Sequence, residues 1–424
     1  MKKRVVITGL GVVAPNGVGL NAFTNAIKNR ISGIKHNPEL ERLQFSCQIS
    51  GTPEISEDFK RNYFSELELR NFNSTGILYG VIAGIDAWND AGLAIENNEN
   101  PDWDSGTIFG TGTSGIDKFR ESIYKIDAFE TRKLGSTAVS QTMNSGVSAY
   151  LGGKLGLGNI VTTNSSACTT GVESLMLGFD RIQSGKAKRI LAGSTSDSGP
   201  YIWGGFDAMK VCTYKHNHSP EKGSRPMSET ASGFVPGSGS GAFVLEELES
   251  ALARGAKIYC EVLGGAINSG GQRGLGSMTA PNPIAVQRCI SDAVKNAGIQ
   301  PHEIDTINGH LTATSKDSLE IKNWSEALHL KGNDFPYINS LKSLVGHCLS
   351  ASGSIECVAS ILQIHQNFIF PNLNIEDLKS EIKEIIDPCK IPNQLIESNI
   401  TIVAKASFGF GDVNGCVIFK KFVH

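Results

Sequence analysis

What this chain of 424 residues lacks excludes several classes of protein. Its nine cysteines are scattered singly, with no C-x-x-C pair. This argues against a disulfide framework and a structural zinc site, and it favours a reducing compartment. No uncharged apolar run approaches the ~20 residues that a membrane span requires. The net charge of −3 gives no reason to expect nucleic acid or an anionic membrane as the principal partner.

The N-terminal segment begins like a signal peptide but does not continue as one. Basic residues 2–4 precede the apolar run 5–7, which glycines interrupt and Pro15-Asn16-Gly17 stops. No small-x-small cleavage site follows. We therefore expect a buried strand that enters a glycine turn, and a cytoplasmic protein.

Apolar strand-like runs alternate with helix-patterned stretches along the whole chain. Such alternation predicts an α/β fold with mostly parallel sheets and helices on both faces. The length exceeds one ordinary core, so two domains or a duplicated unit is expected. We expect strands at residues 5–8, 107–110, 189–192, 258–262, 337–339 and 400–404, and helices at residues 78–91, 171–184, 284–297, 352–366 and 375–385.

The two halves of the chain resemble each other in three places. The matched pairs, in the same order in each half, are residues 5–11 with 260–265, 86–93 with 292–299, and 168–173 with 351–356. Three ordered matches predict a tandem duplication, with a first half at 1–255 and a second at 256–424.

Cys168 has the sequence context of a nucleophile. Small polar residues 162–167 end a strand, and an amphipathic helix begins at the cysteine. Unpaired N–H groups and the helix dipole should lower the thiol pKa from ~8.5 towards neutrality. The same N–H groups can stabilise an oxyanion on an attached thioester. The other cysteines are interpreted as structural: Cys47, Cys212, Cys260, Cys289, Cys348, Cys357, Cys389 and Cys416.

Two histidines of the second half also have contexts that packing does not explain. His310 ends a strand-like run and enters the polar loop 311–314, and His347 ends the segment 339–347. Lys342 lies five residues before His347. Two histidines on equivalent strand-end loops, with a lysine nearby, favour a catalytic role.

Taken in order, these motifs resemble those of the β-ketoacyl-acyl carrier protein synthases, in particular the type II elongating enzymes of the thiolase-like superfamily. The resemblance extends from end to end of the chain. The similar segments are Ser165-Ser166-Ala167-Cys168, His310-Leu311-Thr312-Ala313-Thr314, residues 339–347, residues 225–239 and Ser407-Phe408-Gly409-Phe410-Gly411.

The resemblance implies two duplicated halves, each with a mostly parallel five-stranded mixed sheet, in a layered αβαβα arrangement. It also implies a decarboxylating acyltransferase. Cys168 would carry the acyl group as a thioester. His310 and His347 would stabilise the enolate formed when a malonyl group loses carbon dioxide. Lys342 would polarise the site, and Glu320 would pair with it.

Further residues receive supporting roles from the same resemblance. The N–H groups of Cys168 and Phe410 would hold the oxyanion, and Phe410 would act as a gate. Thr312 and Thr314 would support the site, while Thr113 and Phe206 would line the acyl pocket. Substrates would arrive on the phosphopantetheine of acyl carrier protein, with no bound cofactor or metal. A homodimer, or a heterodimer with a related synthase subunit, is expected.

Departures from the family pattern suggest a specialised branch. Leu311 replaces a usual glycine, Asp412-Val413 replaces Gly-Thr, and Thr113 stands where an isoleucine usually lines the acyl pocket. A smaller, more polar residue there could admit a longer or unsaturated chain, as in a polyene pathway. Two alternatives to the condensing enzyme stay open: a non-catalytic chain-length partner subunit and a non-decarboxylating thiolase.

Overall fold

The fold is built on one mixed sheet whose two halves repeat the same strand order. A computed structural model describes residues 2–95 and 99–423. The first half contains β1 (Val5–Ala14), β5 (Ser105–Thr111), β6 (Val161–Thr162), β7 (Arg189–Ser196) and β8 (Gly239–Glu247). The second half contains β9 (Cys260–Ser269), β10 (Thr306–Asn308), β11 (Tyr337–Asn339), β14 (Ile402–Gly409) and β15 (Val413–Lys420).

The strand directions match between the halves. The strands follow in the order β6-β5-β7-β8-β1 in the first half and β11-β10-β14-β15-β9 in the second. The first two pairings of each series are parallel and the last two are antiparallel. Within these two series of strands, β8 and β15 therefore run against the others. This repeat confirms the predicted duplicated, mostly parallel architecture, while the exact boundary near residue 255 stays a prediction.

The two halves are not separate sheets. β1 and β9 pair antiparallel through Val5–Ile7 and Cys260–Val262, and β2 (Gly17–Val18) adds to β1. This pairing satisfies N–H and C=O groups that two free sheet edges would leave unpaired. One eleven-stranded sheet therefore passes through the molecule.

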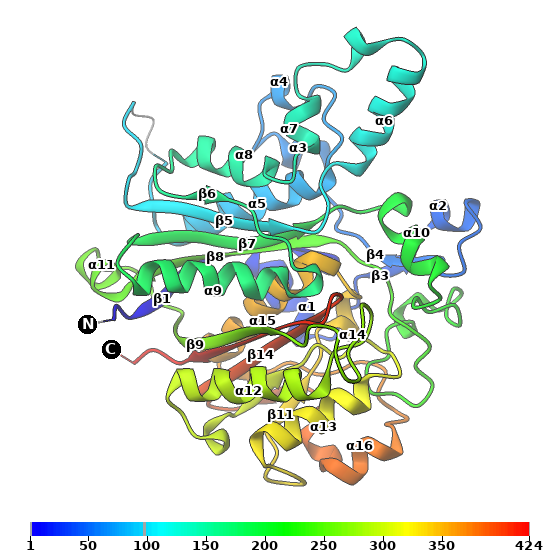
Figure 1. The fold of residues 1–424 in the computed structure, drawn as a ribbon, viewed down its shortest axis with the longest axis vertical. Coiled ribbons are helices and arrows are strands. Elements are labelled where there is room, and N and C mark those ends of the chain that lie inside the picture. The colour runs from blue at the N-terminus through cyan, green and yellow to red at the C-terminus, as the bar shows by residue number, and fades with distance from the viewer. Residues whose placement is uncertain (1, 96–98, 424) are drawn as a thin grey trace.

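Helices form three layers around the strands (Figure 1). α5 (Thr75–Asp90) and α8 (Gly146–Leu155) cover the outer face of the first half, and α12 (Pro283–Ala297) and α13 (Asp317–Leu328) cover the second. Between the halves lie α9 (Thr170–Gln183) and α15 (Ser352–Gln366), which contact each other and strands of both halves. The arrangement confirms the predicted αβαβα layers.

The two central helices cross at a pair of glycines. A Cβ atom on Gly171 would lie 2.2 Å from the backbone nitrogen of Ser354, and one on Gly353 would lie 3.0 Å from the nitrogen of Val172. Glycine at both positions therefore lets the two helix backbones approach closely. This crossing brings the N-terminus of each central helix to the same region of the molecule.

The turns before these helices correct the predicted match of residues 168–173 with 351–356. Each central helix follows a 3₁₀ turn, Ala167–Thr169 before α9 and Leu349–Ala351 before α15. The first residue of each turn has a positive φ, 50° and 49° respectively. Cys168 therefore corresponds to Ser350, one residue before the predicted partner. The sequences alone do not distinguish the two registers because small residues fill both segments.

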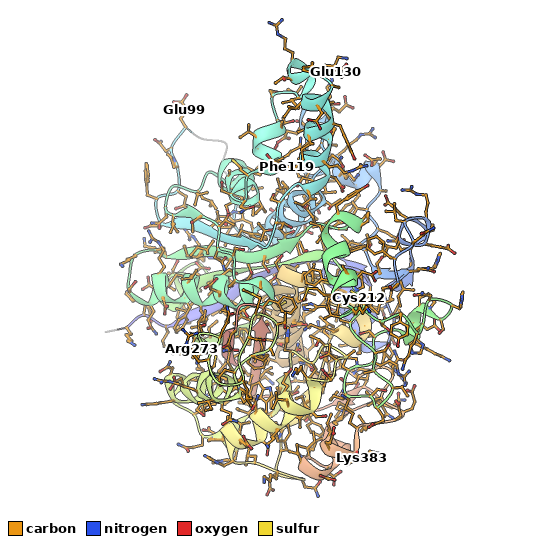
Figure 2. The ribbon with its side chains drawn as sticks, turned by 45° about the vertical axis from the view of Figure 1, so that its right-hand side comes forward. Glu99, Phe119, Glu130, Cys212, Arg273 and Lys383 are labelled. Carbon is orange, nitrogen blue, oxygen red and sulfur yellow. The ribbon has the colours of Figure 1, made fainter. Side chains whose placement is uncertain are left out.

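Other elements surround the layers. α6 (Ile116–Asp127) and α7 (Ala138–Thr142) project beyond the first half, where Figure 2 labels Phe119 and Glu130. In the described part of the chain, no helix is long and apolar enough to cross a membrane. The remaining elements are α1 (Leu20–Lys28), α2 (Pro38–Arg42), α3 (Glu57–Lys60), α4 (Glu66–Leu69), α10 (Pro200–Ala208), α11 (Leu248–Ala253), α14 (Lys342–Val345), α16 (Ser380–Ile385), β3 (Ile34–His36), β4 (Ile49–Gly51), β12 (Phe368–Ile369) and β13 (Ile396–Glu397).

Candidate active site

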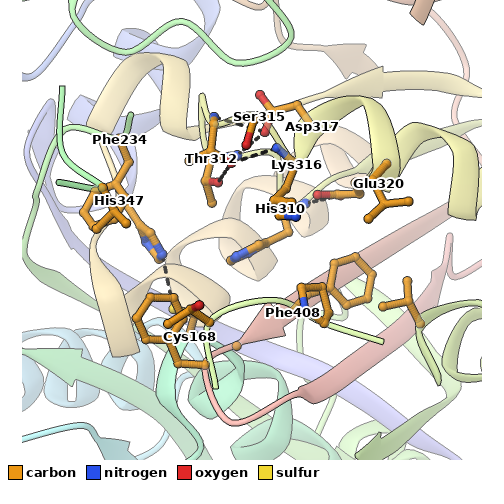
Figure 3. A pocket seen from close by; sticks show the side chains of 18 of the residues that line it. Cys168, Phe234, His310, Thr312, Ser315, Lys316, Asp317, Glu320, His347 and Phe408 are labelled. Atoms are coloured by element: carbon orange, nitrogen blue, oxygen red, sulfur yellow. Dashed lines mark hydrogen bonds between the residues drawn. The ribbon is translucent and has the colours of Figure 1, made fainter. Parts of the chain in front are cut away.

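Cys168 and both predicted histidines line one cavity. The cavity has a volume of about 340 Å³, and Cys168, His310 and His347 all line it (Figure 3). The Sγ atom lies 3.2 Å from Nε2 of His347. Sγ and one ring nitrogen of each histidine all lie within 4.8 Å of one another. The three side chains, which are distant in the sequence, can therefore contact one thioester.

The surroundings of His347 determine which ring nitrogen carries the proton. The backbone N–H of Leu349 donates to Nδ1 at 3.2 Å, and the hydroxyl of Ser352 lies 2.9 Å from the same atom. An atom that accepts an N–H bond carries no proton, so the neutral ring is protonated at Nε2. His347 therefore presents an N–H donor to the sulfur of Cys168.

His310 is oriented in the same way by a different group. The ammonium of Lys342 lies 3.5 Å from Nδ1 of His310. The two imidazole rings pack edge to face, with centroids 5.5 Å apart. Burial and the charge of Lys342 hold the pKa of His310 and of His347 well below the usual value of 6.5. Both rings are therefore neutral donors at neutral pH.

The pKa of the Cys168 thiol is shifted in the direction opposite to the prediction, because the thiol is buried. Burial raises the pKa of Cys168 to about 11, although the charge of Lys342 and the N–H of Phe410 act in the opposite direction. The predicted lowering towards neutrality is therefore wrong. The sequence located the helix start but did not indicate that the turn is buried, and α9 itself begins two residues later, at Thr170.

Lys342 is paired with a different carboxylate from the one predicted. Its Nζ atom lies 2.5 Å from Oε1 of Glu356 on α15. Glu320 instead accepts the backbone N–H groups of His310 and Leu311, each at 2.7 Å, and burial raises its pKa to about 7. The predicted pairing of Glu320 with Lys342 is wrong because α13 places this carboxyl beneath the loop that follows β10. Glu320 thus shapes the backbone that carries His310.

A second buried lysine completes the charged group behind the histidines. Lys405 on β14 is fully buried, and its Nζ lies 2.8 Å from Oε2 of Glu356. Sequence reasoning missed both residues. Glu356 was noted only as part of the repeat, and Lys405 directly follows the run 400–404 that was predicted as a strand. A charged residue inside such an apolar strand was the available signal.

The loop after His310 supplies the polar wall of the cavity. Thr312 and Thr314 line it, and their hydroxyl oxygens lie 3.1 Å apart. The carboxylate of Asp317 accepts the backbone N–H of Thr312 at 3.0 Å. Leu311 is fully buried and has a φ of +22°, which is a strained value for a residue with a side chain. Packing therefore holds Leu311, which replaces the family's usual glycine, in this conformation.

Phe410 lies next to Cys168 and packs against Phe206, whereas Thr113 is not part of this group. The N–H of Phe410 approaches the sulfur of Cys168, and its ring centroid is 5.9 Å from that of Phe206. Phe410 lines the cavity. Thr113 is exposed and is not among the residues that line this cavity. Its assignment to the acyl pocket stays a prediction.

The same three ligand atoms are close enough together to hold a metal ion. However, a histidine that binds a metal normally donates its other ring N–H to an acceptor. Here Nδ1 of His347 faces the N–H of Leu349, and Nδ1 of His310 faces the ammonium of Lys342. These donors oppose metal binding through Nε2, so the arrangement favours hydrogen-bond donation by the histidines.

Comparison with known proteins identifies the family. Residues 2–251 match the family described as Beta-ketoacyl synthase, N-terminal domain, and residues 259–376 match Beta-ketoacyl synthase, C-terminal domain. The chain belongs to the β-ketoacyl synthase family. The synthase is 32% identical to 3-oxoacyl-[acyl-carrier-protein] synthase 1 of Haemophilus influenzae over 99% of both chains. It is also 32% identical to 3-oxoacyl-[acyl-carrier-protein] synthase 2 of Vibrio harveyi, again over 99% of both.

Solved structures agree with this family. A β-ketoacyl synthase from Burkholderia phymatum STM815 has a TM-score of 0.88 and 26% identity, covering 99% of this synthase and 100% of that chain. A type II polyketide ketosynthase in complex with its acyl carrier protein has a TM-score of 0.87 and 27% identity, covering 100% of both chains. The similarity extends over the complete duplicated fold.

Proposed function

We propose that this synthase is a 3-oxoacyl-acyl carrier protein synthase, which condenses an acyl thioester with malonyl-acyl carrier protein and releases carbon dioxide. The observation that carries the proposal is the contact between the Cys168 sulfur and an N–H donor of His347, with His310 beside both. A nucleophile and two aligned donors around one cavity are what a two-step acyl condensation requires.

In the first step, Cys168 takes the acyl group. Its sulfur attacks the thioester carbonyl, and the oxyanion accepts the N–H groups of Cys168 and Phe410, both of which approach the sulfur. The phosphopantetheine thiolate leaves and takes up the proton that Cys168 loses. Because the pKa of the free thiol is about 11, the N–H of His347 assists by stabilising the thiolate as it forms.

In the second step, the two histidines act as donors. The thioester oxygen of the malonyl group accepts the Nε2–H groups of His310 and His347. The bond to the carboxylate breaks, its electron pair forms the enolate, and carbon dioxide leaves. The enolate carbon attacks the carbonyl of the Cys168 thioester, and the Cys168 thiolate leaves and takes a proton from solvent. Neutral imidazoles suit this role because each keeps one ring N–H that can donate to the developing enolate oxygen.

The remaining residues support binding. Thr312 and Thr314 offer hydroxyl groups to the phosphopantetheine arm, and Phe410 gates the cavity beside Cys168. Phe206, which packs against Phe410, and Thr113 would contribute to the acyl pocket. Cys168, the two histidines and the backbone N–H groups supply every group that the two steps above use.

We also propose acyl carrier protein as the partner and a dimer as the working form. The carrier protein is supported by the ketosynthase complex to which this chain is similar. Pairing with an identical or related subunit is supported by exposed apolar side chains on and after α6, which are Phe119, Ile123, Tyr124, Ile126 and Phe129. All nine cysteines are free, which supports the expected cytoplasmic location.

A condensation assay with purified carrier proteins tests the proposal. Wild-type protein, an acyl-acyl carrier protein and malonyl-acyl carrier protein should give a 3-oxoacyl product two carbons longer and one carbon dioxide per product. Replacing malonyl by acetyl carrier should give none. Condensation with acetyl-CoA would support the thiolase alternative, and no reaction with any chain in a saturated and polyunsaturated series would support the chain-length partner. The same series identifies a fatty-acid or a polyene preference.

A further inference from the structure

The ammonium group of Lys405 has no part in the mechanism above, yet it is buried and has three polar contacts. Its Nζ donates to the hydroxyl of Ser407 at 3.1 Å and to the carbonyl of Ala406, and it forms an ion pair with Oε2 of Glu356 at 2.8 Å. The side chain is completely inaccessible to solvent. Lysine is rarely buried in a strand, so its presence at this position needs a specific reason.

The buried group carries an excess of positive charge. Glu356 forms ion pairs with Lys342 through one oxygen and with Lys405 through the other, so one carboxylate faces two ammonium groups. For stability alone, Lys342 and Glu356 would already form a balanced pair, and an apolar side chain at position 405 would pack with less desolvation cost. The second ammonium gives the group a net positive charge instead.

This excess charge lies directly behind the two histidines. Lys342 contacts His310 at 3.5 Å, and Lys405 acts together with Lys342 against protonation of both His310 and His347. Lys405 is also held on the strand that leads into Phe408–Phe410, beside the cavity. Positive charge at this place stabilises negative charge that develops on a substrate bound next to the histidines.

We propose that Lys405 is a positioning residue of the condensation reaction, which forms an ion pair with the second oxygen of Glu356 and so balances the charge of this carboxylate while Lys342 faces His310. Lys405 thereby adds positive charge behind the site where the malonyl enolate forms. The inference rests on the proposed function. It assigns to Lys405 an effect on decarboxylation and none on the first acyl transfer.

The test separates the two half-reactions in Lys405→Met. We expect malonyl decarboxylation to fall about tenfold or more, while acylation of Cys168, followed by mass spectrometry, stays within about twofold. The matched control is Lys420→Met on the neighbouring strand, an exposed lysine, which should leave both steps unchanged. Thermal melting of each variant checks folding.

A charge-balancing double variant distinguishes an electrostatic from a structural role. Lys405→Met leaves Lys342 and Glu356 with no net charge, and adding Glu356→Gln restores one positive charge. We therefore expect the double variant to decarboxylate malonyl faster than Lys405→Met. If the lysine only filled space, the second substitution would add a further loss. Should Lys405→Met fail to fold, Lys405→Gln and its combination with Glu356→Gln make the same comparison.

The pH profile gives an independent measurement. The groups that face the histidine pair are Cys168, Glu320, Lys342, Glu356 and Lys405. Removing one opposing charge raises the histidine pKa, so the acid limb of decarboxylation should move to higher pH in Lys405→Met and return towards the wild-type position in the double variant.

Unchanged decarboxylation in a folded Lys405→Met protein, or a double variant slower than the single one, would overturn the inference. Neither result bears on the proposed function, which fails only if the wild-type protein does not condense.

Discussion

At the catalytic cysteine, burial and charge act in opposite directions on one thiol. The N–H groups of Phe410 and of Cys168 itself point at the sulfur, and Lys342 supplies a positive charge, but desolvation is the larger effect and raises the pKa to about 11. The free enzyme therefore holds a protonated thiol. Deprotonation accompanies attack on the substrate, when the sulfur and the oxyanion share the same donors.

Alkylation of Cys168 tests this protonation state. Because only the thiolate reacts, we expect its rate with iodoacetamide to rise about tenfold per pH unit, without a plateau up to about pH 10, since the pKa is about 11. Peptide mass spectrometry follows Cys168 separately from the other cysteines, and Cys168→Ser provides the blank. A plateau near neutral pH would mean that a thiolate exists before substrate binds.

Some residues of the site could be predicted from the sequence and others could not. Cys168 was found because small polar residues precede it at a helix start, and His310 and His347 because each ends a motif of the second half with Lys342 nearby. Glu356 and Lys405 were missed because each lies inside a helix or strand, and their chemistry arises only when α15 and β14 pack together. The partner of Lys342 was misassigned for the same reason, since Glu320 is nearer in the sequence to His310.

At the scale of elements, the close crossing of α9 and α15 positions the site. Cys168 precedes one central helix and His347 precedes the other, so the separation of the helix N-termini sets the distance between sulfur and imidazole. Gly171 at the crossing admits no side chain because a Cβ would meet the backbone of Ser354 at 2.2 Å. The sequence predicted both helices, but the correct alignment of the two repeats, shifted by one residue from the predicted one, required the turn geometry.

We expect Gly171→Ala to destabilise the protein by about 1–3 kcal/mol, the usual cost of adding a group to a packed interior. The matched control is Gly153→Ala on α8, an exposed helical glycine with no atom within 4 Å of its new Cβ, which should be neutral or slightly stabilising. Urea denaturation followed by circular dichroism measures both variants. Equal stability of the two would show that the helix crossing is looser than described.

At the scale of the whole molecule, the duplicated halves share one core. The largest apolar cluster joins residues of β1 and α9 in the first half with residues of α15 and β14 in the second. The alternation of strands and helices was sufficient to predict the layers. It could not predict that β1 and β9 join the halves edge to edge, because the order of strands and helices does not indicate which unpaired strand edges meet.

The halves have diverged into complementary parts of one site. The first supplies Cys168, and the second supplies His310, His347 and Lys342. The structural counterpart of Cys168 in the second half is Ser350, whose hydroxyl donates to the carbonyl of Thr195. One repeat thus provides the nucleophile, while the corresponding position in the other contributes to packing between the halves.

Peptide mass spectrometry of the wild-type protein and Cys168→Ser, after incubation with acyl-acyl carrier protein, tests the central claim most directly. We predict that the wild-type protein gains one acyl group at Cys168 and loses it as 3-oxoacyl product when malonyl-acyl carrier protein is added. Cys168→Ser should neither retain an acyl group nor form product at more than about a thousandth of the wild-type rate. An acyl group on another residue, or undiminished condensation by Cys168→Ser, would contradict the account.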